Sequence, residues 1–287
     1  MQTAVKNAVS SDQPLSVARA LRESRLDSCD SNLLLRALLG VNSAYLAAHH
    51  DHLLNFRQKA AYQELVLRRE AGEPVAYILG EKEFYGINFE VNPAVLIPRP
   101  ETELLVEQAL ERMPQVQSCN VLELGTGSGN VALCIARHRP SARITAVDRY
   151  EKALAVAQQN GAKLLGADSR NIVFKKSNWY DALGGETYDL IVSNPPYVAS
   201  DDNHLWRGDL RFEPRQALNG GAGGLDCIRR IIHGAPARLR KGGWLLFEHG
   251  YDQALACREL LAQSGFTRLF CVDDLAGIPR VSGGRIN

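Results

Sequence analysis

The sequence predicts an α/β protein with a largely parallel sheet, helices on both faces of that sheet, and a small all-helical domain before it. From residue 119 onward, short apolar stretches alternate with longer amphipathic ones, as expected for successive strand and helix units. A glycine-rich turn joins the first of these strands to the first of these helices. Before residue 75, by contrast, apolar residues recur at helical spacing. The change of pattern indicates two folding units joined by a linker.

Residues 1–74 are predicted to form the helical N-terminal domain. Leu15, Ala18 and Leu21 recur at helical spacing, and a second apolar stretch with the same spacing follows them. A third segment runs from residue 55 to residue 69 before a glycine and a proline close it. We therefore expect a small helical bundle in this part of the chain.

Residues 75–95 are predicted to be a hairpin linker, because residues 84–91 have the pattern of two short strands around a turn. The linker leads into a third region, residues 96–287. Two prolines flank Arg99 there and fix an extended arm, after which a helix can begin at Pro100. The arm can face a ligand or serve as a plain linker, and Arg99 is a candidate substrate-binding residue.

The first strand–helix unit has the pattern of a nucleoside-binding site. A buried strand at residues 121–124 is followed by a turn, Gly125–Gly129, and by an apolar helix at residues 131–136. The next strand, residues 143–147, ends at Asp148. Glycines let the backbone approach a ligand closely, and an acidic residue about 20 residues further on suits ribose hydroxyls.

The turn also narrows the choice of nucleoside. Its G-x-G-x-G pattern differs from the G-x-G-x-x-G spacing of dinucleotide-binding turns, and no Gly-Lys-Ser or Gly-Lys-Thr sequence is present to hold phosphates. S-adenosylmethionine, a nucleoside without phosphate, is therefore favoured. Trp179 follows the next strand, at residues 171–174, and can either stack near the adenine or simply pack against the protein.

A second candidate site lies where a strand at residues 188–193 runs into the turn Asn194-Pro195-Pro196-Tyr197. Asn194 and Pro195 each precede a proline, so the backbone of the turn has few conformations available. The side-chain oxygen of Asn194 and the carbonyl of Pro195 can each accept one N–H of a planar NH2 group, while Tyr197 packs on its flat face. A strand end closed by two prolines, without chemistry, is the alternative interpretation.

The remaining elements complete the alternation. A long loop at residues 198–223 is of the kind that forms lids or binding surfaces. The elements expected after it are a helix over residues 225–239 that Gly242 and Gly243 break, a strand over 244–248, a helix over 252–264, and strands over 267–272 and about 279–286. The last strand is expected to close the sheet in an antiparallel direction.

Composition and charge exclude several protein classes. A net charge of +1 provides no global field to attract nucleic acid or membranes, so no direct nucleic-acid partner is expected. Scattered cysteines without a Cys-x-x-Cys pair, no signal segment and no stretch of roughly 18 apolar residues predict a soluble cytoplasmic protein. Neighbouring His49, His50 and His52 would point in different directions on a helix, which predicts a solvated helix end and no metal site.

With the glycine-rich turn, Asp148 and residues 194–197 in this order, the chain resembles class I S-adenosylmethionine-dependent methyltransferases whose Asn-Pro-Pro-Tyr motif acts on a planar nitrogen. It is more closely similar to the HemK/PrmC family, which methylates the side-chain amide of the glutamine in the Gly-Gly-Gln motif of peptide chain release factors. The stretches that carry this resemblance are residues 96–103, 124–129, 193–197, 208–214 and 242–250. It departs from the family at residues 281–287, where we expect a strand with fewer glycines.

The resemblance implies a Rossmann-like class I methyltransferase sheet, a helical N-terminal domain that recognises the release factor, and no metal. The cofactor-binding residues it implies are Gly125, Thr126, Gly127, Ser128, Gly129, Asp148, Trp179 and Asn194. Those implied to act on the substrate are Asn194, Pro195, Pro196 and Tyr197, with Arg99 as a further substrate contact and Asn194, Pro195 and Tyr197 as the catalytic set.

The chemistry of this assignment is positioning. A glutamine amide nitrogen is a poor nucleophile, because its lone pair is delocalised, and hydrogen bonds from both N–H groups would orient it and stabilise developing positive charge. Three alternatives stay open: a glutamine methyltransferase of a ribosomal protein, a DNA methyltransferase acting on the amine of adenine, and a cofactor-binding module without catalysis. The low net charge disfavours DNA, and the intact Asn-Pro-Pro-Tyr turn disfavours the module.

Overall fold

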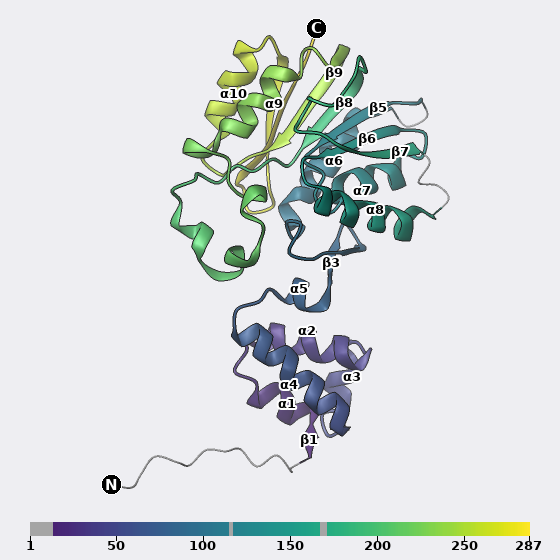
Figure 1. Cartoon of the computed structure of the whole chain (residues 1–287), viewed down its shortest axis with the longest axis vertical. Helices are drawn as coiled ribbons and strands as arrows, with labels where there is room; N and C mark the ends of the chain where they lie inside the picture. The colour runs from purple at the N-terminus through teal and green to yellow at the C-terminus, as the bar shows by residue number, and fades with distance from the viewer. Residues whose placement is uncertain (1–13, 115–116, 167–170) are drawn as a thin grey trace. The chain divides into compact units, whose positions relative to one another are not determined.

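The computed structural model describes residues 14–114, 117–166 and 171–287 (Figure 1). The chain divides into two compact units, Met1–Leu79 and Gly80–Asn287. The first unit therefore extends five residues beyond the 1–74 domain expected from the sequence, and the hairpin of the expected 75–95 linker belongs to the second unit.

The N-terminal unit is a bundle of short helices around one core. The helices are α1 (Val17–Glu23), α2 (Ser28–Leu39), α3 (Ser43–Ala48), α4 (Phe56–Glu70) and α5 (Val75–Leu79). The expectation of an all-helical unit is wrong in one respect, because β1 (Leu15–Ser16) pairs antiparallel with β2 (Leu53–Leu54). Side-chain caps explain where four of the helices start: Ser16, Asp27, Asn42 and Asn55 accept backbone N–H groups of the first turn. The three histidines follow α3 and are exposed, as expected.

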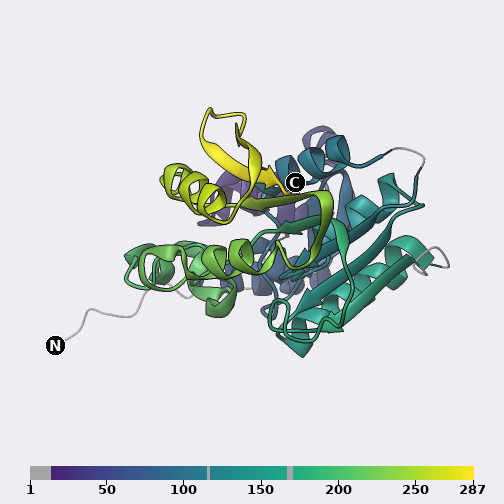
Figure 2. The same cartoon turned by 90° about the horizontal axis from the view of Figure 1, so that it is seen from above.

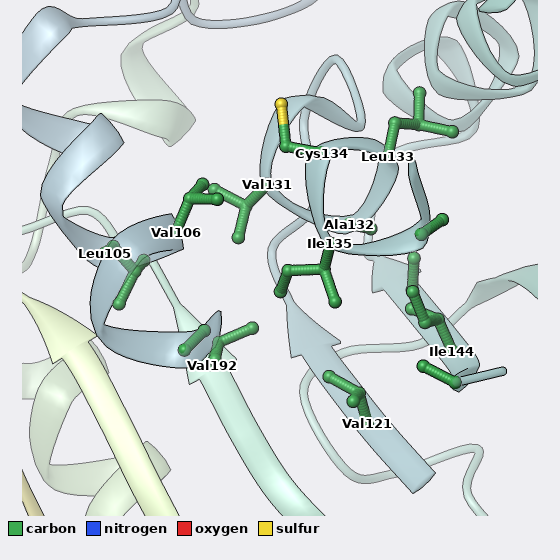
Figure 3. Close-up of a cluster of buried hydrophobic side chains, with 14 of the residues drawn as sticks. Leu105, Val106, Val121, Val131, Ala132, Leu133, Cys134, Ile135, Ile144 and Val192 are labelled. Atoms are coloured by element: carbon green, nitrogen blue, oxygen red, sulfur yellow. The ribbon is translucent and has the colours of Figure 1, made fainter. Parts of the chain in front are cut away.

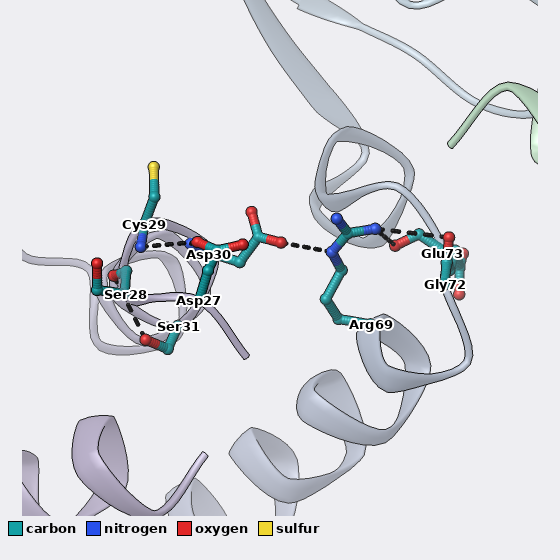
Figure 4. A network of polar contacts seen from close by, with 8 residues as sticks. All are labelled: Asp27, Ser28, Cys29, Asp30, Ser31, Arg69, Gly72 and Glu73. Carbon is teal, nitrogen blue, oxygen red and sulfur yellow. Dashed lines mark hydrogen bonds and ion pairs between the residues drawn. The ribbon is translucent and has the colours of Figure 1, made fainter. Parts of the chain in front are cut away.

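A polar network links α2 to the end of α4 within this unit (Figure 4). The Arg69 Nε donates to Asp30 Oδ2 at 2.5 Å, and its Nη1 donates to the backbone carbonyl of Glu73 at 3.2 Å. Asp27 accepts the N–H groups of Cys29 and Asp30, both at 2.9 Å. Arg69, in the last turn of α4, thus ties the segment that follows this helix to the first turn of α2.

The second unit begins with a hairpin and continues as a strand–helix alternation. Its strands are β3 (Glu81–Phe84), β4 (Ile87–Glu90), β5 (Asn120–Leu124), β6 (Arg143–Asp148), β7 (Ile172–Lys176), β8 (Tyr188–Ser193), β9 (Leu239–Glu248), β10 (Thr267–Asp273) and β11 (Pro279–Arg285). Its α-helices are α6 (Glu103–Arg112), α7 (Asn130–His138), α8 (Glu151–Leu165), α9 (Asp226–Gly234) and α10 (Ala254–Gln263). In the described residues of this unit, 3-10 helices span Pro100–Thr102, Asn203–Trp206, Gly208–Phe212, Arg215–Ala217 and Ala222–Gly224.

Strands β5 to β11 form one sheet of seven strands in the order β10-β11-β9-β8-β5-β6-β7. The pairs β5–β6, β5–β8, β6–β7 and β8–β9 are parallel, and β11 runs antiparallel to both of its neighbours. The expected sheet, largely parallel with one antiparallel strand, is confirmed. Because β5 lies between β6 and β8, the chain reverses its direction of growth there, and ligands of such sheets bind at that point.

The two faces of the sheet are covered by different helices (Figures 1 and 2). Val121, Val192 and Leu246 belong to the core with α6 and α7, where Leu105 and Ile135 also pack (Figure 3), and α8 packs on β6 and β7. Residues one position along the same strands point to the opposite face and pack with α9 and α10: Leu122, Ile191 and Leu245. This two-sided burial explains why the strands are apolar without alternation.

The region between α9 and β9 differs from the expectation. The predicted helix over residues 225–239 ends at Gly234, because Pro236 cannot donate a helical hydrogen bond and restricts the residue before it. Gly242 and Gly243 do not break a helix but lie inside β9, where the pairing with β8 shifts register. Gly242 has φ +80°, so this irregularity needs a glycine.

The glycines of the last strand have a packing reason. A Cβ on Gly283 would lie 2.3 Å from the Leu245 carbonyl oxygen and 2.7 Å from the Phe270 ring, and one on Gly284 would lie 2.8 Å from Leu269. Strand β11 is held between β9 and β10, so neither neighbour can move aside. The unexpected glycines at 283 and 284 thus allow this strand to enter the sheet.

Gly283→Ala should therefore destabilise the second unit by about 1–3 kcal/mol through overpacking. All three tryptophans of the chain, Trp179, Trp206 and Trp244, lie in this unit, so their fluorescence during urea unfolding reports its stability. The matched control is Gly185→Ala, where an added Cβ meets no atom within 4 Å and a change within about 0.5 kcal/mol is expected. Equal stabilities of the two variants would contradict this packing account.

Candidate active site

A cavity of about 610 Å³ lies at the carboxyl ends of β5, β6 and β8. The register pairs Leu124 with Val147 and with Ser193, so the residues that follow these three positions meet at one edge of the sheet. They are the glycine turn, Asp148 and Asn194, and all three line the cavity. The arm over residues 94–99 and parts of the loop over residues 198–219 complete its wall.

The glycine turn exposes backbone to the cavity. Gly125 and Thr126 donate their N–H groups to the Val147 carbonyl at 2.8 and 2.9 Å, which fixes the start of the turn against β6. Gly127 has φ +54°, and a Cβ added to it would meet no protein atom within 4 Å. Gly125, Thr126, Gly127 and Ser128 line the cavity. Gly129 does not line the cavity. A Cβ added to it would lie 3.1 Å from Leu133 and 3.2 Å from Ala157, so this glycine is packed against other parts of the protein.

Asp148 presents a fixed carboxylate to this space. Its Oδ2 accepts the N–H of Gly127 at 3.0 Å and its Oδ1 accepts the N–H of Tyr150 at 2.9 Å. Burial raises the pKa of Asp148, and these two hydrogen bonds oppose the rise because they favour the charged form. Each oxygen keeps a further lone pair, so the carboxylate can also accept hydroxyl groups of a ligand.

Trp179 lies near the glycine turn in an uncommon backbone conformation. Its φ is +56°, and Ser177 supports it by donating its hydroxyl to the Trp179 carbonyl at 2.7 Å. A Cβ added to Gly125 would lie 3.7 Å from the indole, so the ring borders the turn. Both Trp179 and Ser177 line the cavity. The indole is therefore available as a flat apolar wall.

The Asn194 side chain belongs to a chain of hydrogen bonds. Its Nδ2 donates to Thr102 Oγ1 at 2.9 Å, and Thr102 Oγ1 donates to Glu248 Oε2 at 2.6 Å. The Tyr197 hydroxyl donates to the other oxygen, Glu248 Oε1, at 2.9 Å. Glu248 is 1% exposed, and burial raises its pKa while the two hydroxyl donors oppose that rise. Among the described residues, Asn194 Oδ1 makes no hydrogen bond and remains an open acceptor.

Arg99 lies at the wall of the cavity and is already paired. It forms an ion pair with Glu213, whose carboxylate is fully buried and also accepts the N–H of Ile97 at 3.0 Å. Glu213 thereby ties the arm to the loop over residues 198–223. A buried carboxylate with two donors is a firm anchor, and removing one partner would leave a charge without compensation.

The other predicted site residues differ in whether they line the cavity. Pro196 lines the cavity, whereas Pro195 is buried and Tyr197 lies behind the wall with its hydroxyl on Glu248. Four polar residues that sequence reasoning did not single out belong to the site: Thr102, Glu123, Glu213 and Glu248. Glu248 carries a signal that could have found it, because it closes an apolar strand in the way that Asp148 does.

Glu123 is a further buried carboxyl group of the site. It lies in β5, is 2% exposed and lines the cavity. Thr126 donates its hydroxyl to Glu123 Oε2, and the N–H of Ala132 donates to the same oxygen at 3.2 Å. Burial raises the pKa of Glu123 to about 8, although these hydrogen bonds favour the charged form.

Two known families match separate parts of the chain. Residues 16–80 match the PrmC N-terminal domain, and residues 100–208 match the methyltransferase small domain. A release factor glutamine methyltransferase of Burkholderia pseudomallei is 48% identical over 95% of this chain and 97% of its own length. One of Bordetella pertussis is also 48% identical, over 92% of this chain and 97% of its own.

Solved structures share the fold. A SAM-dependent methyltransferase from Agrobacterium tumefaciens superimposes with a TM-score of 0.52 at 16% identity, covering 72% of this chain and 70% of that one. Within residues 14–114, 117–166 and 171–287, no helix has the length and apolar character needed to cross a membrane. The same part of the chain contains no group of three or more His, Cys, Asp or Glu side chains arranged to hold a metal ion.

The raised pKa of Glu123 should make stability depend on pH. Folded protein keeps this proton up to pH about 8, whereas the unfolded chain releases it near the ordinary value of 4.5. Glu123 therefore makes its full contribution to the free energy of unfolding below pH 4.5. That contribution falls as the pH rises from 4.5 to about 8, by up to roughly 1.4 kcal/mol per pH unit. Glu123→Gln, which cannot ionise, should lack this loss.

The measurement is urea unfolding of both proteins at pH 5, 6, 7 and 8, followed by tryptophan fluorescence. The difference between wild type and Glu123→Gln cancels the titration of all other groups that the substitution leaves unchanged. A difference that stays constant across this range would show that Glu123 is ionised in the folded protein.

Proposed function

The chain belongs to the family of release factor glutamine methyltransferases, and we propose that it methylates the glutamine of the Gly-Gly-Gln motif in peptide chain release factors. The methyl donor is S-adenosylmethionine, and the acceptor is the side-chain amide nitrogen. The observation that carries the proposal is the Asn194 side chain, which keeps its oxygen free as an acceptor at the wall of the cavity. The full-length similarity to relatives of this name supports the same substrate.

The residues around the cavity fit the cofactor. Asp148 can accept ribose hydroxyls, Trp179 offers an apolar face to the adenine, and the backbone of the turn from Gly125 to Ser128 lines the cavity. Open space next to Gly127, where a Cβ would meet nothing within 4 Å, allows a ligand to approach the backbone. When bound, S-adenosylmethionine supplies an electrophilic methyl group on a sulfonium sulfur. Gly129 contributes by packing rather than by contact.

Asn194 holds the substrate nitrogen in this proposal. Its Oδ1 accepts one N–H of the glutamine amide, and the Pro195 carbonyl accepts the other. Two acceptors in the plane of an NH2 group orient the nitrogen and stabilise the positive charge that develops as its bond to carbon forms. As this bond forms, the bond between the methyl carbon and the sulfonium sulfur would break and leave S-adenosylhomocysteine. One N–H proton would pass to solvent, which restores a neutral methylamide. Tyr197 supports the turn through Glu248, and Pro196 and Arg99, which line the cavity, are the further substrate contacts in this proposal.

The proposal also covers how the release factor is recognised and in which cellular compartment the protein works. The N-terminal unit is the part that recognises the release factor, because a tripeptide offers too little area to select one protein. The residues matching the PrmC N-terminal domain support this role. All six cysteines are free thiols, which supports a reducing, cytoplasmic setting.

Methyl transfer tests the proposal directly. Labelled S-adenosylmethionine should transfer its methyl group to a purified release factor and not to a release factor whose motif glutamine is replaced by alanine. Label on a ribosomal-protein extract or on duplex DNA instead would identify the protein as a ribosomal-protein methyltransferase or a DNA methyltransferase. Cofactor binding without transfer to any of them would mean that the chain is a binding module.

Asn194→Ala should lower turnover on the release factor by on the order of 100-fold or more, because the oriented acceptor is lost. The matched control is Asn88→Ala, an exposed asparagine of β4 in the same unit, which should keep wild-type turnover. Initial rates at saturating cofactor and release factor give the comparison. Near-wild-type turnover in Asn194→Ala would exclude a role of this amide in catalysis.

A further inference from the structure

We propose that Thr102 and Glu248 are positioning residues, which fix the direction of the Asn194 amide so that its oxygen, not its nitrogen, faces the substrate. The inference rests on the proposed function, since it assigns what sets the acceptor of a planar NH2 group. Neither residue lies in the Asn-Pro-Pro-Tyr turn. Thr102 ends the 3-10 helix before α6, and Glu248 ends β9.

An asparagine side chain has two ends of opposite hydrogen-bonding character. The oxygen accepts and the NH2 group donates, and a half turn about the last side-chain bond exchanges them. Only one orientation suits a substrate that itself presents an NH2 group. With the NH2 of Asn194 turned toward such a substrate, two donors would face each other. Something in the protein must therefore select the orientation.

Thr102 makes this selection because its hydroxyl has one hydrogen. That hydrogen is directed to Glu248 Oε2 at 2.6 Å, so Thr102 Oγ1 has only lone pairs left for Asn194. It accepts from Asn194 Nδ2 at 2.9 Å, which leaves Asn194 Oδ1 for the cavity. The direction of each hydrogen bond thus follows from the one before it.

Glu248 sets the direction at the start of the chain. An ionised carboxylate can only accept, and its two oxygens receive the hydroxyls of Thr102 and Tyr197. Of the charged groups around it, Arg280 favours the ionised form and Glu101 opposes it. The adjacent His249 is buried, with its pKa lowered by desolvation, and the Tyr197 hydroxyl has its pKa raised by burial and by Glu248. A protonated Glu248 could donate to Thr102, whose hydrogen would then turn toward Asn194 and reverse the amide.

The first test compares Thr102→Val with Thr102→Ser. Valine keeps the shape of threonine and removes the hydroxyl, whereas serine keeps the hydroxyl. We expect turnover on the release factor to fall roughly 10- to 100-fold in Thr102→Val, with KM for the release factor and Kd for S-adenosylhomocysteine within about threefold of wild type. Thr102→Ser should stay within about fivefold of wild type. A role in stability alone would lower the thermal midpoint of Thr102→Val without this split between kcat and KM.

The second test replaces the acceptor at the start of the chain. In Glu248→Gln, the amide can accept from only one of the two hydroxyls, so we expect a loss of turnover similar to that of Thr102→Val. Wild-type kcat should also fall as pH drops through a pKa above that of an ordinary glutamate, and Glu248→Gln should lack that acid limb. An acid limb of equal position in both proteins would overturn the role of Glu248.

A measurement without catalysis keeps this inference separate from the proposed function. In wild type, the Asn194 Nδ2 hydrogen bonded to Thr102 should exchange slowly with solvent, and the side-chain 15N–1H signal can be assigned by its loss in Asn194→Asp. Exchange should accelerate at least about tenfold in Thr102→Val and not in Thr102→Ser. Fast exchange in wild type, or equal exchange in all three, would overturn the inference even if the release factor is methylated. Slow exchange without any methylation of the release factor would instead remove the proposed substrate and leave the orientation of Asn194 established.

Discussion

The carboxylate of Glu248 is the group on which the arrangement of the site depends. Burying an ionised carboxyl group costs several kcal/mol unless hydrogen bonds compensate for the lost water. Here the hydroxyls of Thr102 and Tyr197 donate hydrogen bonds to the carboxylate. Thr102 in turn accepts a hydrogen bond from Asn194 Nδ2 and so fixes the orientation of that amide. The segment before α6, the turn after β8 and the end of β9 are thus held at one place. None of the three could shift without leaving a buried polar group unpaired.

The sheet brings these segments together, and most of the sheet was predictable. Each strand of the parallel part is an apolar run bounded by turn residues, so local patterns placed β5 to β9 in order and put Asp148 and Asn194 at strand ends. Adjacent parallel strands then bring their carboxyl ends to one edge, which is how residues far apart in the chain come to line one cavity. The part of the cavity wall that depends on local motifs, formed by the glycine turn and Asp148, was therefore predictable from the sequence.

The contacts that complete the site were not visible, for a physical reason. Thr102 is 92 residues from Asn194 and 146 from Glu248, and no periodicity or motif encodes contacts over such separations. The same holds for Glu213, which is 116 residues from Ile97. It also holds for the glycines of β11, because a side chain there is excluded only once Leu245 and Phe270 pack on either side of the strand. The prediction of a helix over residues 225–239 was wrong for a different reason. There, apolar spacing was followed past Pro236, although a local rule of backbone geometry ends the helix before that residue.

The Asn-Pro-Pro-Tyr turn is consequently an incomplete site by itself. Its prolines restrict the backbone, but they cannot choose between the two orientations of the asparagine amide. Tyr197 is engaged with Glu248, and the carbonyl of Tyr197 accepts the side-chain N–H of Gln253 at 3.0 Å, so its position is set from outside the turn. In the proposed mechanism the turn supplies the acceptor, and Thr102 from the segment before α6 and Glu248 from β9 decide that its oxygen faces the cavity. On this proposal, chemical selectivity for a planar NH2 group belongs to the tertiary structure rather than to the four-residue motif.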